Sequence, residues 1–267
     1  MDLKEKTAAI LKQYEVGSRF SYLPVLPKAS VLIPLFVRDG EVHMLMTLRS
    51  QEVGTGRVEC NRDCVICGSE WSISSKLGSA ASGGHSCASK AEVLGLHQLR
   101  TNAGEVCFPG GKRDPRDRDD VDTALREAEE EIGLPPDQVD VVCTLFPIMN
   151  KSGLLVTPVV GFIEASFSPR PNPAEVSAVF TVPLEFFTRE IDHSSYSATG
   201  IAGLLHSFQF PDPESGSHYQ IWGLTAILAI LVSVLALRKK PEFETGFDSD
   251  DPVSFFQHNL NKRISKL

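Results

Sequence analysis

The sequence predicts an α+β fold, in which helices pack on the faces of a β-sheet. Apolar runs of β type recur along most of the chain, whereas a helical pattern stands in its middle at residues 123–132. One such pattern within a mostly β sequence is typical of helices packed on the faces of a sheet. The totals agree, because 42% hydrophobic and 22% charged residues are ordinary for a soluble globular protein.

The first two strands are expected to form a hairpin. Residues 29–37 and 42–48 are runs of β type, and Asp39-Gly40 stands between them. Asp-Gly between two apolar runs favours a tight hairpin turn. Further strands are expected at residues 106–108, 139–149, 154–165 and 179–187, the first of them leading into Pro109-Gly110-Gly111.

Two helices are expected outside the middle of the chain. Residues 1–16 are typical of a short amphipathic helix and lack the apolar core of a signal peptide. Residues 221–237 are apolar or small, and three cations follow them. As a helix this run would measure roughly 25 Å, which is near the lower limit for a membrane span of about 20 residues. We expect a buried core helix, with a membrane span as the alternative.

Residues 51–96 differ in kind from the rest of the single domain predicted over residues 1–267. They are rich in Ser, Gly and other small residues without a sustained period, which predicts a flexible insertion. The insertion contains five side chains that could bind Zn²⁺: Cys60, Cys64, Cys67, His85 and Cys87. Their pairing is imperfect, so we favour a tolerated loop, because closure entropy grows only logarithmically with loop length.

The helix in the middle of the chain carries its own start and stop signals. Asp120 or Asp122 can cap an N-terminus near Thr123, and Gly133 is placed to end the helix before two prolines. A buried stripe is expected from apolar residues at spacings of three and four: Leu125, Ala128 and Ile132.

Three glutamates of this helix share another face. Glu127, Glu130 and Glu131 are spaced as i, i+3 and i+4, so their carboxylates repel one another unless a cation lies between them. A hard divalent ion such as Mg²⁺, which takes oxygen ligands, would offset that repulsion. A merely solvated acidic face is the alternative.

The segment Arg126–Leu134 resembles the Nudix box, the signature of the Nudix hydrolase family. It fits the box at every fixed position, from Arg-Glu through Glu-Glu to Gly and an apolar residue. The upstream half departs from the pattern, because 14 residues separate Gly111 from Arg126 where the usual box has thirteen. The early glutamate of the box is not filled as expected, and the region holds several aspartates instead: Asp114, Asp117, Asp119 and Asp120.

A second signature resembles the coenzyme A diphosphatase branch of this family. Leu45–Ser50 matches its first half, with Met46 a mild deviation, and Arg100–Gly111 matches its second half. The two halves are usually three residues apart, but here 49 residues separate Ser50 from Arg100. Two more segments resemble the branch, and the second of them favours a core helix at 221–237: Pro171–Val176 and Ile221–Ala226.

The resemblance implies the Nudix fold, with a mixed β-sheet sandwiched between α-helices, and hydrolysis of a phosphoanhydride. Coenzyme A and acyl-coenzyme A would be cut at the diphosphate, giving 3′,5′-ADP and 4′-phosphopantetheine or its acylated form. The cofactor would be Mg²⁺ or Mn²⁺, with a set of four implied ligands: Glu127, Glu131, Glu130 and Gly111.

Other residues are candidates for supporting roles. Arg126 would orient the glutamates by charge-assisted hydrogen bonds, with a surface ion pair as the alternative. Glu130 is one candidate for the general base and Glu175 is another, although for Glu175 we favour an ordinary exposed acid. Four cations are candidates for binding the extra 3′-phosphate of the substrate, since a fixed guanidinium suits phosphate geometry: Arg49, Arg100, Lys112 and Arg113. A merely solvated side chain is the alternative for each of them.

Two other functions stay open. A Nudix hydrolase for NADH or ADP-ribose would share the box, and an inactive isoform would act only as a metal or ligand binder. The net charge of -8 argues against nucleic-acid binding. Ser265-Lys266-Leu267 predicts recognition by the peroxisomal import receptor and a location in the peroxisomal matrix. We expect a monomer.

Overall fold

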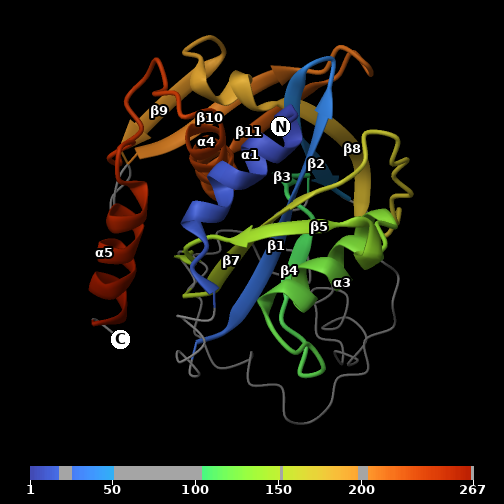
Figure 1. Ribbon diagram of the computed structural model, residues 1–267, viewed down its shortest axis with the longest axis horizontal. Coiled ribbons are helices and arrows are strands. Elements are labelled where there is room, and N and C mark those ends of the chain that lie inside the picture. The colour runs from blue at the N-terminus through green and yellow to red at the C-terminus, as the bar shows by residue number, and fades with distance from the viewer. Residues whose placement is uncertain (18–25, 51–103, 151–152, 198–203, 266–267) are drawn as a thin grey trace, which may run out of the picture. The chain divides into compact units, whose positions relative to one another are not determined.

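A mixed sheet of eight strands lies at the centre of the described structure (Figure 1). The computed structural model describes residues 1–17, 26–50, 104–150, 153–197 and 204–265. The insertion predicted at 51–96, with its candidate zinc ligands, and residues 266–267 of the targeting signal lie outside these ranges.

The main path of the sheet runs through β3 (Val106–Cys107), β2 (Glu41–Arg49), β1 (Lys28–Arg38), β7 (Leu155–Phe162) and β5 (Asp140–Thr144). Three further strands pair alongside this path: β4 (Gly110–Lys112) with β1, β6 (Ile148–Met149) with β7, and β8 (Val176–Pro183) with β2. Strands β1 and β7 are parallel, whereas the other pairs are antiparallel. The sheet is therefore mixed, as predicted.

The predicted hairpin is confirmed at the start of the sheet. Arg38 lies opposite Glu41, and Asp39 and Gly40 form the two-residue turn. Both turn residues have positive φ, 53° at Asp39 and 79° at Gly40, as a type I′ turn requires. Because turn type and length fix the register of a hairpin, this turn sets the pairing of β2 with β1 from Glu41 to Met44.

Strand β1 is central in the sheet, yet it contains Pro34, which has no backbone N–H to donate. The N–H of Leu32 points to the β4 side and donates to the carbonyl of Pro109 at 2.8 Å. Pro34, two residues on, faces the same side, because backbone directions alternate along a strand. On that side the partner of β1 changes from β4, which pairs with β1 as far as Val31, to β2, which pairs with β1 from Leu35 onwards. The proline therefore sits where no ladder hydrogen bond is required.

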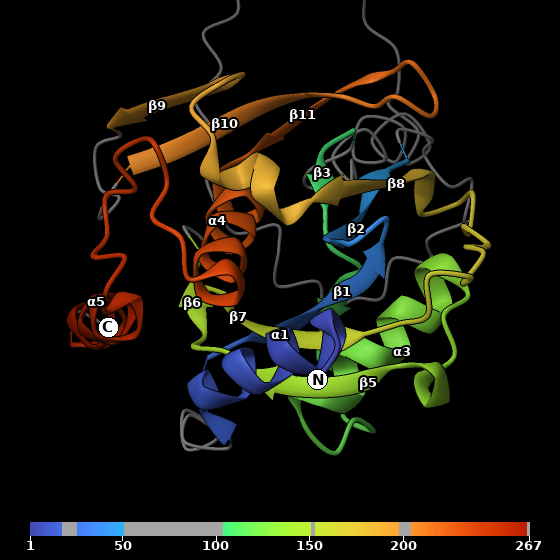
Figure 2. The same cartoon turned by 45° about the horizontal axis from the view of Figure 1, so that its top comes forward.

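Helices cover both faces of the sheet (Figures 1 and 2). On one face α3 (Asp120–Ile132) packs through a buried apolar cluster: Leu32, Phe36, Leu45, Ala124, Ala128, Ile132, Leu134, Val159, Ile163 and Val176. On the other face α1 (Leu3–Leu11) and α4 (Gly223–Leu237) join the larger core. A second, antiparallel sheet packs against α4 and runs in the order β11 (His218–Trp222), β10 (Leu204–Pro211) and β9 (His193–Ser197). This arrangement confirms the predicted α+β class.

The apolar run at 221–237 forms a core helix. Its first two residues belong to β11 and the rest form α4, in which residues 228–236 are all buried. Among the residues that the structure describes, no helix combines the length and the apolar character needed to cross a bilayer. Burial of nearly the whole helix circumference explains its uniformly apolar sequence.

Helix α3 begins earlier than the sequence predicts. Its N-cap is Asp119, whose carboxylate accepts a hydrogen bond of 2.8 Å from the N–H of Asp122. Capping by Asp120 or Asp122 was therefore a wrong prediction, because both already lie in the first turn. The predicted end at Gly133 is confirmed, since Gly133 is left-handed at φ 66° and its N–H donates to the carbonyl of Glu129.

Other elements differ from the prediction. The run at 139–149 is divided into β5 and β6, with Pro147, which cannot donate a ladder hydrogen bond, in the break. Strand β4, the second sheet and helix α5 (Pro252–Ile264) were not predicted. Strand β9 is polar and largely exposed, so it lacks the alternation by which strands are recognised.

Replacing Asp119 by Ala should lower the free energy of unfolding by about 1 kcal/mol, because the N–H of Asp122 loses its acceptor. Asp119→Ser keeps a capping oxygen and should recover most of the loss. Denaturant unfolding followed by circular dichroism measures the difference. Equal stability of Asp119→Ala and the wild type would mean that another residue caps α3.

Candidate active site

A buried carboxylate marks the candidate site near the end of α3. Glu131 is only 2% exposed. It follows Ala128 by three residues and Ala124 by seven, so it belongs to the helix face that packs on the sheet. Its Oε2 accepts a hydrogen bond of 3.2 Å from the N–H of Gly110, and its Oε1 lies 3.7 Å from Nη2 of Arg49. One acid of the Glu-rich helix is thus held in the core beside the glycine pair.

Burial changes the acidity of this carboxyl group. Loss of solvent raises the pKa of Glu131 to about 7, although Arg49 and the N–H of Gly110 favour the charged form. Burial also raises the pKa of Glu127, one turn earlier, against the effect of Arg126. The negative charge of Glu175 adds to the rise in pKa of both glutamates. Two desolvated carboxylates one turn apart form a position where a positive ion would be stabilised.

The glycine pair leaves room for these carboxylates. A Cβ atom on Gly111 would lie 2.4 Å from the carboxylate of Glu127, and one on Gly110 would lie 2.4 Å from the carbonyl oxygen of Ser30. Any side chain at either position would displace the glutamate or strand β1. Glycine is required here for close approach of the backbone, and pairing of β4 with β1 holds that backbone in place.

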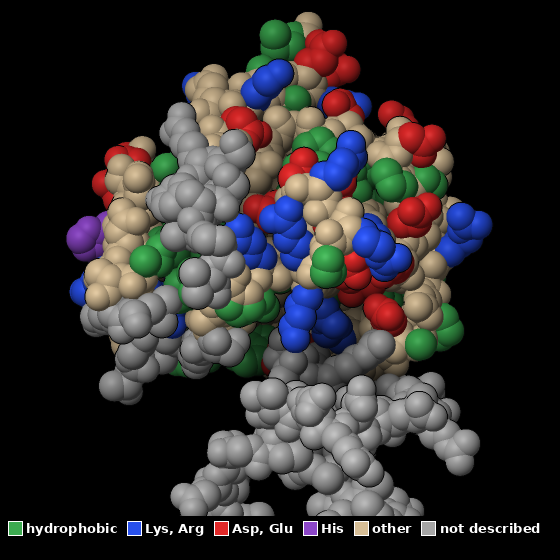
Figure 3. All heavy atoms as spheres, turned by 90° about the horizontal axis from the view of Figure 1, so that it is seen from below, with side chains coloured by type: hydrophobic (Ala, Val, Ile, Leu, Met, Phe, Trp, Pro, Cys, Tyr) green, Lys and Arg blue, Asp and Glu red, His purple; other side chains and the backbone are tan. Residues whose placement is uncertain are grey.

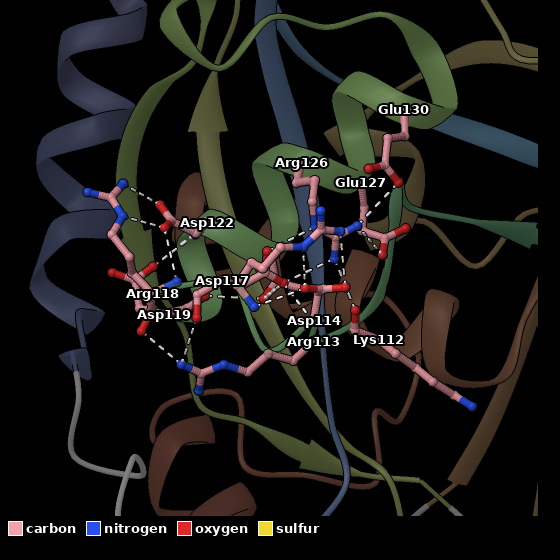
Figure 4. Close-up of polar contacts among 12 residues, drawn as sticks. Lys112, Arg113, Asp114, Asp117, Arg118, Asp119, Asp122, Arg126, Glu127 and Glu130 are labelled. Carbon is pink, nitrogen blue, oxygen red and sulfur yellow. Dashed lines mark hydrogen bonds and ion pairs between the residues drawn. The ribbon is translucent and has the colours of Figure 1, made fainter.

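Arg126 is the centre of a polar network beside the buried acids (Figure 4). Its guanidinium donates two hydrogen bonds, of 2.9 and 3.0 Å, to the carboxylate of Asp117. It also lies 2.9 Å from Glu127 and 3.2 Å from Glu130, and it donates to the carbonyl of Lys112. Arg126 therefore links the loop after β4 to two of the three glutamates.

Asp117 is a site residue that sequence analysis does not single out. Four aspartates lie between residues 114 and 120, and the pattern gives no reason to choose among them. Besides the contacts with Arg126, its carboxylate accepts hydrogen bonds from the hydroxyl of Thr123 and the N–H of Asp114. The hydrogen bonds with Arg126 are the chief reason why the pKa of Asp117 is well below its ordinary value. The early glutamate missing from the box was the signal that could have identified it.

The two candidate general bases have different surroundings. The side chain of Glu130 is 55% exposed and is paired with Arg126. Glu175 is half-buried in the loop before β8, and its carbonyl accepts a hydrogen bond of 2.9 Å from the N–H of Ser50. Its charge acts on Glu127 and Glu131. Glu175 therefore acts on both buried acids, whereas Glu130 acts on Glu127 and is paired with Arg126.

Within the described residues, no group of three or more acidic, histidine or cysteine side chains is arranged to hold a metal ion. The donor chemistry of Glu127 and Glu131 nevertheless suits a hard divalent cation. Both offer carboxylate oxygens, both are desolvated, and the neighbouring Gly111 carries no side chain. These two glutamates are the candidate ligands, and Glu130 does not join them in one cluster.

The four predicted substrate cations are placed differently. Arg49 is 24% exposed and lies beside Glu131. Arg113 donates to two backbone carbonyls of the following loop, so it stabilises that loop. Lys112 is exposed and extends away from the network (Figure 4), and Arg100 lies outside the described residues. Lys and Arg side chains gather beside Asp and Glu side chains on the face seen from below (Figure 3).

Similar proteins share these segments. The family model of the NUDIX domain matches residues 86–197. The peroxisomal coenzyme A diphosphatase of Mus musculus is 37% identical over 266 residues, which cover 99% of this chain and 93% of the mouse protein. This chain belongs to the Nudix hydrolase family. Helix α3 therefore carries its Nudix box, at Arg126–Leu134.

Other relatives cover less of the chain. Two Arabidopsis thaliana proteins, Nudix hydrolase 22, chloroplastic, and Nudix hydrolase 15, mitochondrial, are 44% and 43% identical over 54% and 55% of it. The matches span about half of those proteins, 49% and 52%. The crystal structure of a C. elegans Ap4A hydrolase binary complex aligns with a TM-score of 0.37 and 14% identity, over 60% of this chain and 82% of that one. This structural likeness is too weak to add to the family assignment.

Glu131 should make the metal-free Nudix domain less stable as the pH rises. The pKa of this group is raised from 4.5 to about 7 by folding, so the folded state binds the proton more tightly. The free energy of unfolding therefore falls from about pH 4.5 to about pH 7 and stays low above that range. Glu131→Gln has no such titration and should be the more stable protein at pH 8.

The expected advantage of Glu131→Gln over the wild type at pH 8 is at most about 3 kcal/mol, since a tenfold change in proton affinity equals about 1.4 kcal/mol. It should shrink towards pH 5. Denaturant unfolding with a chelator present measures it, and Glu129→Gln, on the exposed side of α3, serves as the control. Parallel pH curves for the wild type and Glu131→Gln would contradict the prediction.

Proposed function

We propose that this Nudix hydrolase cleaves the diphosphate of coenzyme A and acyl-coenzyme A, releasing 3′,5′-ADP and 4′-phosphopantetheine or its acylated form. Similarity to the mouse diphosphatase along nearly the whole chain supports this substrate class. The observation that carries the proposal is a meeting of three distant segments. Arg49, from the first half of the coenzyme A signature, contacts Glu131 of the Nudix box and donates to the carbonyl of Gly110, from the second half.

In this proposal Glu127 and Glu131 hold one divalent cation, Mg²⁺ or Mn²⁺, with the backbone of Gly111 beside them and Glu130 at the margin. When bound, the ion polarises a phosphoryl oxygen and makes water a better nucleophile near neutral pH. Arg126 keeps Glu127 and Glu130 in place through charge-assisted hydrogen bonds.

Of the two candidate general bases, we favour Glu175. It is half-buried, and its charge acts on both Glu127 and Glu131, whereas the carboxylate of Glu130 is engaged by Arg126. Glu175 would accept the proton of the attacking water, which requires a carboxylate within reach of the reacting phosphate.

The substrate phosphates require cations around this site. Arg49 is the first candidate, because its planar guanidinium suits phosphate geometry and lies beside the buried acid. Lys112 is exposed on the strand that carries the glycine pair and would add a point charge. Arg113 would act by holding the loop after β4, and Arg100 is included on the family resemblance alone.

An inactive isoform is the main alternative, because the insertion separates the two halves of the coenzyme A signature. The described ends of the interrupted segment support an intact site. The N–H of Gly104 donates to the carbonyl of Arg49 at 3.1 Å, and the N–H of Arg49 donates to the carbonyl of Glu105 at 3.0 Å. The chain thus leaves β2 and returns at neighbouring positions, and a loop closed between such ends has a modest entropic cost.

The peroxisomal matrix is the location that we propose, following the name of the mouse relative. Recognition of Ser265–Leu267 by the import receptor and a monomeric state belong to the same proposal. The Arabidopsis relatives are named chloroplastic and mitochondrial, so imaging of an N-terminally tagged chain, with and without these three residues, is needed to distinguish the compartments.

The activity test is Mg²⁺-dependent release of 3′,5′-ADP from coenzyme A, measured by chromatography. The full chain, a chain lacking residues 51–96, and Glu127→Gln are compared, with Glu129→Gln as the matched control on the same helix. We expect activity in the first two proteins and in the control. Glu127→Gln should lose at least about 100-fold in kcat, because several kcal/mol of transition-state stabilisation depend on the cation.

Each other outcome has a definite meaning. Faster turnover of NADH or ADP-ribose than of coenzyme A would replace the substrate and keep the site. Activity only in the shortened chain would mean that the insertion disables the full-length protein, which would then be a binder. Absence of hydrolysis in both chains would refute the proposed function.

A further inference from the structure

The loop that carries Glu175 is bound to the C-terminal end of α3. The N–H of Asn172 donates to the carbonyl of Glu131 at 2.9 Å, and the N–H of Arg170 donates to the carbonyl of Ile132 at 2.8 Å. These carbonyls belong to the last turn of the helix, where no intrahelical N–H is available for them. The loop therefore completes the helix that carries the buried acid.

Asn172 is the residue from which this loop turns towards Glu175. Its carbonyl accepts hydrogen bonds from the N–H groups of Glu175 and Val176, both at 2.8 Å. Its side-chain Oδ1 accepts a third, of 3.2 Å, from the N–H of Ala174. An asparagine that binds the backbone two residues ahead forms an Asx turn, which stabilises a tight change of direction.

The turn is restricted at both ends. Residues 171 and 173 are prolines, so φ is fixed on either side of Asn172. At the far end, the carbonyl of Glu175 accepts a hydrogen bond from the N–H of Ser50, the residue after Arg49. The turn therefore connects the helix that carries Glu131 with the strand that carries Arg49.

We propose that Asn172 is a positioning residue, whose hydrogen bonds set the place of the Glu175 carboxylate relative to Glu127 and Glu131. Its backbone bonds attach the turn to α3, and its side-chain bond to Ala174 keeps the turn tight. Loss of the side-chain bond moves Glu175 away from the other two acids. This inference rests on the proposed function for the role of Glu175 in hydrolysis. It does not rest on it for cation binding, because a carboxylate whose charge acts on Glu127 and Glu131 also attracts a cation held between them.

The test is a double-mutant cycle of Asn172→Ala and Glu175→Gln. One readout is the affinity of the substrate-free protein for Mn²⁺, measured by electron paramagnetic resonance, and the other is kcat and KM for coenzyme A. We expect Glu175→Gln to weaken Mn²⁺ binding and to lower kcat by about tenfold or more. Asn172→Ala should lower the Mn²⁺ affinity and kcat by about threefold to fivefold each, with little change in KM. The double variant should equal Glu175→Gln, because a residue that acts through Glu175 has no further effect once that carboxylate is gone.

Two further variants separate positioning from general destabilisation. Asn172→Ser keeps an oxygen acceptor for the turn and should restore both readouts. Asp248→Ala removes a bond of the same type, from the N–H of Asp250 at 2.9 Å, on an exposed segment between α4 and α5, and should leave both readouts unchanged.

Additive losses in the double variant, or an Asn172→Ala protein with unchanged Mn²⁺ affinity and kcat, would overturn the inference. A wild-type protein that does not hydrolyse coenzyme A would refute the proposed function instead. In that case the Mn²⁺ cycle still decides whether Asn172 positions Glu175.

Discussion

The site depends on one interaction, the burial of the Glu131 carboxylate against the backbone of Gly110. A charged group in the core is costly unless hydrogen bonds and an opposite charge compensate it. The N–H of Gly110 and the guanidinium of Arg49 provide that compensation. Strand β4 must therefore lie against β1, and β2 must end where its arginine reaches the helix. The sheet and α3 can pack in this way only if the acid, the glycine and the arginine meet.

In the proposed metal site, burial would favour a cation more than spacing does. Like charges at i and i+4 on a solvated helix repel by only about 0.2–0.5 kcal/mol. Desolvation of a carboxylate costs several kcal/mol, on the order of ten times more. Glu127 and Glu131 are both desolvated, whereas Glu130 is exposed and paired with Arg126. The acids therefore differ in kind, although the sequence pattern presents them as equivalent.

Two loops are attached to α3, one through Arg126 and one through Asn172. Arg126, on α3 itself, pairs with Glu127 and Glu130 and is fixed by Asp117 of the loop after β4. Asn172 attaches the loop of Glu175 to the end of α3. Charged side chains that project from one short helix are thus constrained by two loops, and a preorganised set of this kind loses little entropy when substrate and cation bind. The described ends of the interrupted segment meet at β2 and β3, next to Arg49. Backbone hydrogen bonds between these two ends keep Arg49 in place, although the signature is interrupted after Ser50.

The sequence by itself determined those features that depend on local torsion angles and periodicity. Asp39-Gly40 specifies the turn because both residues tolerate positive φ, and Gly133 ends α3 for the same reason. The apolar run at 221–237 favoured a buried helix, with a membrane span as the alternative. The Nudix box and the coenzyme A signature identify the family from residues alone. The sequence did not indicate the second sheet, because its outer strand is polar and exposed.

Only the tertiary structure decided which acid is buried, which aspartate caps α3, and which aspartate holds Arg126. Glu131 occupies the apolar stripe of the helix at a position where an apolar residue is expected. Which aspartate caps α3 and which one holds Arg126 depends on where strands β1 and β4 place the loop between β4 and α3. Local patterns fix backbone conformation within a turn or two, whereas solvent exposure and the partners of a charge are set by residues that are distant in sequence.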